Sequence, residues 1–156
     1  MTIDVEVIRR QAASLLADEH DAIANAANLS ALIFHALPDV NWAGFYFARG
    51  GELVLGPFQG KPACVRIASG TGVCGTAFAQ RRTIVVADVH AFPGHIACDA
   101  ASNAEIVVPL SRPDGTVFGV LDVDSPMPGR FGDEDRRLLE ALSALYVSGS
   151  RLESLV

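Results

Sequence analysis

Two apolar segments joined by one tight turn constrain the fold of this chain most. Residues 105–112 (EIVVPLSR) and 116–126 (TVFGVLDVDSP) flank the turn Pro113-Asp114-Gly115, which predicts an antiparallel hairpin. Both segments are apolar at nearly every position, a pattern typical of strands that are covered on both faces. We therefore expect a sheet with helices or another layer packed on each side.

The rest of the chain supplies further strands and helices in a mixed order. Further strands are predicted as a hairpin over 41–60 that turns at Arg49-Gly50-Gly51, and at 64–68 and 83–88. Helices are predicted over 3–17 with Thr2 or Asp4 as cap, from Asp21 to Pro38, in a short segment around Cys74, and over 131–155. This order predicts an α+β fold in which residues 1–156 form one domain, with an antiparallel sheet of about six strands and helices packed against it.

Composition and charge exclude several classes of partner. Half of the 156 residues are hydrophobic and the mean hydropathy is +0.31, which is enough to bury a core. The chain has no apolar run of about 18 residues, and its N-terminus lacks the apolar stretch of a signal peptide. The net charge of −6 argues against a basic nucleic-acid-binding surface. We expect a cytoplasmic protein with no nucleic-acid or membrane partner.

The three cysteines, Cys64, Cys74 and Cys98, are an odd number, and no two of them form a CxxC pair. In a reducing compartment we expect them to be free thiols at rest. Their spacing does not resemble a zinc knuckle or a thioredoxin motif, so we expect no bound metal. A metal site built from the cysteines and a histidine is the less favoured alternative.

Cys98 is the cysteine most suited to chemistry. It lies in the long polar segment 89–104, near a predicted helical turn at 96–101, and a helix N-terminus lowers the pKa of a thiol. His90 and His95 lie close in sequence and add positive charge if they are protonated. An inert cysteine in a loop is the alternative reading of the same pattern.

Three acids accompany the predicted hairpin. Asp122 and Asp124 are two residues apart, so they point to the same face of a strand. Pairing through the turn at 113–115 brings Glu105 close to them, and clustered carboxyl groups raise one another's pKa. One of the three is then a usable proton donor. A solvated strand end is an equally good explanation on this pattern alone.

Aromatic residues gather on the first predicted strand. Trp42, Gly44 and Tyr46 share one face of a period-2 strand. Gly44 is expected to leave an open place between the two rings, where a small apolar group can sit. Simple core packing is the favoured reading of such a cluster without other information.

The motifs NWAGFYF, GPFQGKPAC, GVCGTA, DVHAFPGHIACDAASNAEIVVPL and GVLDVDSP resemble those of the free methionine-(R)-sulfoxide reductases. The resemblance covers about residues 39–140, and it is more specific than a general likeness to GAF domains. It implies a GAF-like domain that reduces the R epimer of free methionine sulfoxide.

The resemblance also implies roles for individual residues. Cys98 matches the nucleophile, Cys64 the main resolving cysteine, and Cys74 a third cysteine that can join disulfide exchange. Glu105 matches the acid that engages the sulfoxide oxygen. The implied substrate-binding residues are the aromatic pair around the methyl group, the acidic pair, and loop residues beside the nucleophile: Trp42, Tyr46, Asp122, Asp124, Ile96 and Ala97.

The family likeness implies no bound cofactor, an external thioredoxin that receives electrons from NADPH through its reductase, and a homodimer as one option. Two other classes stay open. A non-catalytic GAF module would bind a small molecule as a sensor and would need neither Cys98 nor Glu105. A thiol peroxidase or redox sensor would use Cys98 and Cys64 but would not need Trp42 or the acids.

Overall fold

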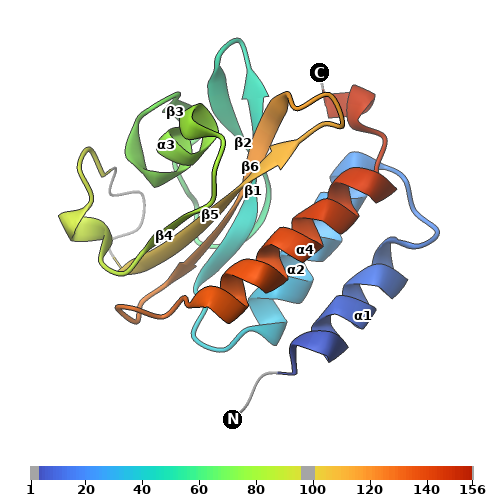
Figure 1. Cartoon of the computed structure of the whole chain (residues 1–156), viewed down its shortest axis with the longest axis horizontal. Coiled ribbons are helices and arrows are strands. Elements are labelled where there is room, and N and C mark those ends of the chain that lie inside the picture. The colour runs from blue at the N-terminus through green and yellow to red at the C-terminus, as the bar shows by residue number, and fades with distance from the viewer. Residues whose placement is uncertain (1–3, 96–100, 156) are drawn as a thin grey trace.

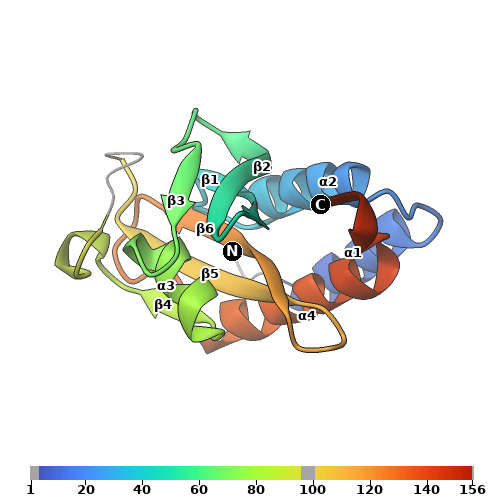
Figure 2. The same ribbon diagram turned by 90° about the horizontal axis from the view of Figure 1, so that it is seen from above.

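A computed structural model describes residues 4–95 and 101–155, and within them the chain forms one antiparallel sheet of six strands. The strand order is β3-β2-β1-β6-β5-β4, so the predicted 105–126 hairpin lies beside the first hairpin at the centre (Figures 1 and 2). The strands are β1 (Trp42–Arg49), β2 (Glu52–Gly60), β3 (Arg66–Ala68), β4 (Ile84–Val86), β5 (Ala104–Ser111) and β6 (Val117–Ser125). The predicted six-stranded antiparallel architecture is confirmed.

Four α-helices and two short 3₁₀ turns complete the described part of the chain: α1 (Val5–Leu16), α2 (Ala22–Ala36), α3 (Gly72–Gln80), α4 (Asp133–Gly149), η1 (Val89–Ala91) and η2 (Leu152–Leu155). The predicted cap Asp4 is confirmed, because its carboxylate accepts the N–H groups of Glu6 and Val7. The predicted start of the second helix at Asp21 is also confirmed, and the Asp21 carboxylate caps it by accepting the N–H of Ala24. No helix among the described residues is long and apolar enough to cross a membrane.

The closing helix is shorter than the sequence predicts. It ends at Gly149, whereas the pattern predicts helix up to residue 155. The Gly149 carbonyl is hydrogen-bonded by the His20 ring at 2.9 Å, and the Arg151 N–H donates to the His20 carbonyl at 2.8 Å. These contacts with the α1–α2 connection redirect the chain, and residues after the helix turn into η2.

The two faces of the sheet pack against different layers. Helices α2 and α4 pack on one face, here called the three-helix face, with α1 packed against both helices, and α3 lies on the opposite α3 face (Figure 2). Alternate residues of each strand enter the two cores, as strand geometry requires. Phe45, Ile106 and Leu121 lie in the core of the three-helix face, and Tyr46 and Val107 lie in the core of the α3 face.

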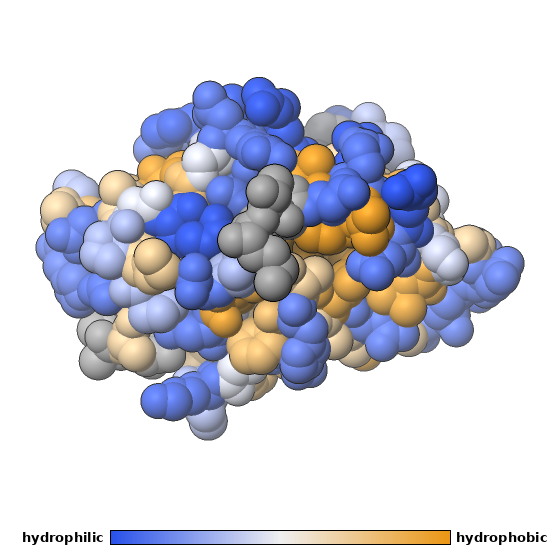
Figure 3. All heavy atoms as spheres, turned by 90° about the horizontal axis from the view of Figure 1, so that it is seen from below, coloured by the Kyte–Doolittle hydropathy of each residue, from blue (hydrophilic) through white to orange (hydrophobic). Residues whose placement is uncertain are grey.

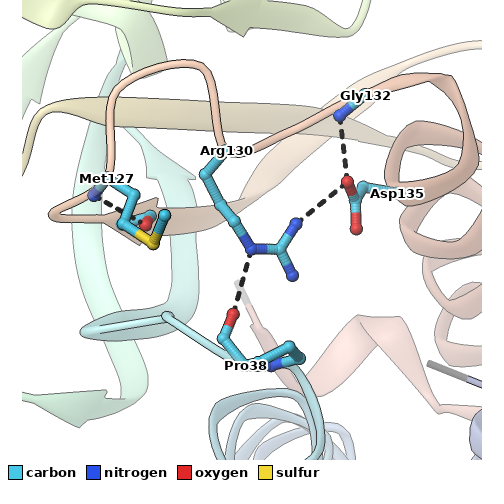
Figure 4. Close-up of polar contacts among 6 residues, drawn as sticks. Pro38, Met127, Arg130, Gly132 and Asp135 are labelled. Carbon is cyan, nitrogen blue, oxygen red and sulfur yellow. Dashed lines mark hydrogen bonds and ion pairs between the residues drawn. The ribbon is translucent and has the colours of Figure 1, made fainter. Parts of the chain in front are cut away.

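A partly buried arginine ties the ends of the central strands to the helices (Figure 4). The Nε of Arg130 donates to the Pro38 carbonyl at 3.0 Å, and its Nη1 pairs with Oδ2 of Asp135 at 3.1 Å. The same Oδ2 accepts the N–H of Gly132 at 2.9 Å, at the start of α4. The contacts of Arg130 thus join the segment before β1 to the segment after β6. They hold in place the two strand ends nearest the predicted site.

The exposed hydrophobic surface is broken into small patches. Figure 3 shows these patches interrupted by hydrophilic residues on the face that it displays. Among the large exposed hydrophobic residues, Val7 and Leu15 share α1, and the others come from separate elements and loops: Ile23, Val65, Val85 and Met127. Scattered apolar residues of this kind are normal on a protein surface. They do not identify a partner surface, and the homodimer stays a prediction.

Candidate active site

Strand register brings the three predicted acids to one end of the sheet. Glu105 of β5 lies opposite Asp124 of β6, and Asp124 lies opposite Trp42 of β1. In the next row of the same face, Asp122 lies opposite Val107 and Gly44. The predicted approach of Glu105 to the two aspartates is therefore confirmed, and it follows from the turn that pairs β5 with β6.

Cys74 reaches the same place from the other layer. It lies in the first turn of α3, and its Sγ donates a hydrogen bond to Oε2 of Glu105 over 3.7 Å. The helix packs closely here, because a Cβ added at Gly75 would be only 2.4 Å from the carbonyl oxygen of Ala68. One ligand atom from each of Cys74, Glu105 and Asp122 lies within 4.8 Å of the others.

Burial gives this cluster unusual acidity. The exposed fractions are 4% for Cys74, 8% for Glu105 and 5% for Asp122. Burial raises the pKa of Glu105 well above its usual range, and the neighbouring Asp122 carboxylate raises it further. Burial, followed by the charge of Asp124, likewise raises the pKa of Asp122, and burial followed by Asp122 raises the pKa of the Cys74 thiol. Protons are therefore held at the cluster under conditions where exposed carboxyl groups are ionised.

The aromatic residues form a wall beside the acids and also hold the neighbouring loop. Trp42 stacks on Tyr46 and Phe58, with ring centroids 6.0 and 5.2 Å apart. The Trp42 Nε1 donates to the Lys61 carbonyl at 3.1 Å, and the Tyr46 hydroxyl donates to the Cys64 carbonyl at 2.8 Å. Both polar tips thus anchor the segment that carries Cys64.

The expected open place at Gly44 is wrong. A Cβ added there would lie 2.3 Å from the Cβ of Phe58, and 2.8 Å from Cη2 of Trp42. Phe58 of β2 faces Gly44 directly and fills that space. The glycine is needed for this close cross-strand approach and leaves no room for a ligand.

The open space lies instead over the acids, as a narrow cavity of about 50 Å³. Six of the predicted site residues line it: Trp42, Tyr46, Cys74, Glu105, Asp122 and Asp124. Cys64 is half-buried beside it, next to the lining residues Pro62 and Ala63. Its sulfur is in a disulfide, so the expectation of free thiols is wrong for Cys64, whereas Cys74 is a free thiol as expected. The predicted residues Ile96, Ala97 and Cys98 lie outside the described part of the chain.

Three further polar residues line the cavity, and the sequence did not single them out as site residues: Thr71, His95 and Ser102. Ser102 is buried, and its Oγ accepts a hydrogen bond from Nδ2 of Asn41 at 3.3 Å. His95 lines the cavity mouth with its ring 5.9 Å from that of His90. Burial and the charge of His90 lower the pKa of His95, so this ring is neutral near pH 7 and does not supply the expected positive charge. The only sequence signal for Ser102 was its place as a polar residue three positions before Glu105.

Comparison with known proteins identifies the family. The GAF domain family model matches residues 18–148. The free methionine-R-sulfoxide reductase of Escherichia coli is 54% identical over 88% of this chain and 82% of its own length. The chain belongs to the GAF-domain family of free methionine-R-sulfoxide reductases. This confirms both the sequence resemblance and the predicted GAF fold.

Solved structures of the family superpose closely on this chain. A Staphylococcus aureus fRMsr, solved in complex with substrate, is 51% identical with a TM-score of 0.89, over 96% of this chain and 99% of that one. The Neisseria meningitidis free methionine-R-sulfoxide reductase, also in complex with its substrate, is 44% identical with a TM-score of 0.88, over 92% and 86% of the two chains.

Proposed function

We propose that this protein reduces free L-methionine-(R)-sulfoxide to L-methionine by thiol chemistry. The observation that carries the proposal is the buried acid cluster at the end of an aromatic-walled cavity. A sulfoxide is attacked at sulfur only when its oxygen takes up a proton, and Glu105 is a carboxyl group whose pKa is raised by burial and by Asp122. Family membership and the two substrate complexes of relatives support the same reaction.

The first step transfers the sulfoxide oxygen to a cysteine. Glu105 donates its proton to the oxygen while the thiolate of Cys98 attacks the sulfur. Methionine leaves with the sulfur reduced by two electrons, and Cys98 is oxidised to a sulfenic acid. Glu105 is left as a carboxylate in a buried site, and it recovers a proton before the next turnover.

The second step restores the nucleophile. The thiol of Cys64 condenses with the sulfenic acid of Cys98, which releases water and forms a disulfide. The half-buried position of Cys64, its carbonyl bond to Tyr46 and its oxidised sulfur support it as the resolving cysteine. Cys74 is less suited to this step, because burial and the acids keep its thiol protonated. Thioredoxin then reduces the disulfide, with NADPH as the electron source and no bound cofactor.

Specificity for the free amino acid follows from recognition of both of its charged ends. The methyl group and the sulfur lie against Trp42 and Tyr46. Asp124 is the acid that holds the ammonium group, because it is partly exposed at the cavity rim whereas Asp122 is buried beside Glu105. Main-chain N–H groups at Ile96 and Ala97 hold the carboxylate. A peptide bond at either end removes one of these charged contacts.

A coupled thioredoxin assay tests the proposal. Free methionine-(R)-sulfoxide, its S epimer and the N-acetylated R sulfoxide are offered separately, and NADPH oxidation is followed. We expect turnover of the free R epimer alone, and no turnover after Cys98→Ser. Turnover of none of the three by fully reduced protein would refute the proposal and favour the sensor class, which a small-molecule binding screen would then examine.

A further inference from the structure

We propose that Cys74, Glu105 and Asp122 form a binding site for a thiophilic divalent cation of the Zn²⁺ class, and that the cation blocks the cavity. The three residues come from α3, β5 and β6, and all three are buried. One ligand atom of each lies within 4.8 Å of the other two. A thiol and two carboxyl groups thus converge on one point at the end of the cavity.

The spacing fits a tetrahedral ion. A zinc ion about 2.3 Å from a sulfur and about 2.1 Å from an oxygen separates those two atoms by about 3.6 Å at the tetrahedral angle. The Sγ of Cys74 and Oε2 of Glu105 are 3.7 Å apart.

An unsatisfied oxygen is the second, independent observation. Oδ1 of Asp122 is buried and has no hydrogen-bond partner, although the residue lines the cavity. A buried carboxyl oxygen without a partner is costly, and a cation is the ligand that compensates it most strongly. The cavity itself leaves a fourth coordination position for water, which gives the open arrangement of three protein ligands and one solvent molecule.

The donor set selects the ion. A thiolate sulfur favours zinc and cadmium over magnesium or calcium, which take oxygen ligands. No lysine or arginine is among the described residues that line the cavity, and Asp124 adds a further carboxyl group at its rim. No cationic side chain there competes with the ion, and the ion displaces the protons that the thiol and the two carboxyl groups hold.

Occupation has a consequence for the reductase. An ion held by Glu105 and Asp122 covers the carboxyl group proposed to protonate the sulfoxide and fills the space for the S–O group. Substrate and ion then exclude each other. This inhibitory consequence rests on the proposed function, whereas cation binding does not.

The binding test isolates Cys74 as the only thiol. The full chain carrying Cys64→Ser and Cys98→Ser is titrated with Cd²⁺ without added dithiol, and the ultraviolet charge-transfer band of a cadmium thiolate is recorded. We expect one equivalent to bind, with Zn²⁺ competing for the same site and Mg²⁺ failing to compete. Absence of the band, or displacement by Mg²⁺ at similar concentration, would overturn the proposal.

Isosteric variants in this background assign the ligands. Cys74→Ser should abolish the band, and Asp122→Asn should weaken Cd²⁺ binding by more than about tenfold, since even residues outside the first coordination shell contribute that much. The matched control is Glu52→Gln, whose carboxylate pairs with Arg66 on the surface, and it should bind Cd²⁺ as tightly as the parent. Equal affinity in the Asp122→Asn variant would overturn the site even if the thiol binds cadmium, and circular dichroism verifies that each variant is folded.

The activity arm separates the two proposals. In single-turnover reactions of the wild-type chain, micromolar Zn²⁺ should raise the concentration of free methionine-(R)-sulfoxide at which the observed rate constant is half-maximal. A chelator should reverse the effect. Activity that zinc does not change would refute the inhibitory site while leaving the reductase intact. A normal cadmium titration in a chain that reduces no sulfoxide would support the cation site and refute the proposed function.

Discussion

The two faces of the central sheet use alternate residues of the same strands, yet they bury different chemistry. On β6, Leu121 and Val123 enter the core of the three-helix face, while Asp122 between them enters the α3 face. On β5, Ile106 follows Glu105 in the same way. All of these residues are buried, so the difference lies in polarity and not in exposure.

The comparison separates residues that stabilise the fold from residues that carry the proposed chemistry. Burying a large aliphatic side chain contributes about 1.5–3 kcal/mol to folding. Burying a carboxyl group has a cost unless the group is protonated or paired, and burial raises the pKa of both Glu105 and Asp122. Both faces bury apolar side chains that stabilise the domain, and only the α3 face also buries this carboxyl pair, at some cost in stability.

Glu105→Gln should give the largest effect on activity and almost none on folding. The amide keeps the size of the side chain but cannot donate a proton to a developing sulfoxide oxygen, so we expect kcat/KM for free methionine-(R)-sulfoxide to fall by about 10²- to 10⁴-fold. The free energy of unfolding should be unchanged or higher at neutral pH. Glu52→Gln on the surface serves as the control, and full activity of Glu105→Gln would show that the proton comes from another group.

Leu121→Ala should show the opposite behaviour. The side chain is fully buried against the helices, and its removal leaves a cavity that should lower the free energy of unfolding by about 2–5 kcal/mol. Denaturant titration measures this loss. The activity per folded molecule should stay within about twofold of wild type, because the cavity over the acids is untouched. A much larger loss of kcat/KM would mean that the two faces are not independent.

The pH dependence of stability should report the acids of the α3 face. The folded-state pKa of Asp122 is raised above its unfolded value of about 4, so the folded chain binds more protons than the unfolded chain between the two values. This group's contribution to stability is therefore full below about pH 4 and is lost as the pH rises through that window, at up to about 1.4 kcal/mol per pH unit. Asp122→Asn should reduce this slope and leave the part that the raised pKa of Glu105 contributes, which denaturant unfolding at several pH values would measure. Parallel stability curves for the two proteins would refute the raised pKa.

Sequence pattern predicted most of this fold because its signals are local. The turn residues at 49–51 and 113–115 set both hairpins, and the latter pairing also predicts that Glu105 meets Asp124. The caps Asp4 and Asp21 each act within three residues of their own position. Chemistry that depends on neighbours along the chain was therefore visible before the structure.

Contacts between distant segments were not predictable in this way. The pairing of β1 with β2 is irregular between Gly44 and Tyr46, and it places Phe58 over the glycine that was expected to be open. The approach of Cys74 to Glu105 depends on how α3 packs on the sheet, which no periodicity reveals. The end of α4 depends on His20, more than 100 residues earlier in the chain.

Two tyrosines offer the smallest and sharpest test of the comparison. Tyr46 on the α3 face donates to the Cys64 carbonyl, and Tyr146 under the three-helix face donates to the Ala22 carbonyl, both at 2.8 Å. Tyr46→Phe and Tyr146→Phe each remove one hydroxyl and keep the ring, so each should cost about 1 kcal/mol of stability.

Of the two variants, only Tyr46→Phe should slow the reaction, and it should slow only the step that forms the disulfide. The lost bond loosens the segment that carries Cys64, so disulfide formation should slow by about fivefold, the equivalent of about 1 kcal/mol, while methionine release in a single turnover stays near wild type. Quenched-flow sampling of methionine and of free thiols separates the two steps. Slowing of disulfide formation in both variants would assign the effect to general loss of stability, and slower methionine release in Tyr46→Phe would place the hydroxyl on the substrate. Because the two bonds have the same chemistry and length, a difference between the variants can come only from the face on which each tyrosine lies.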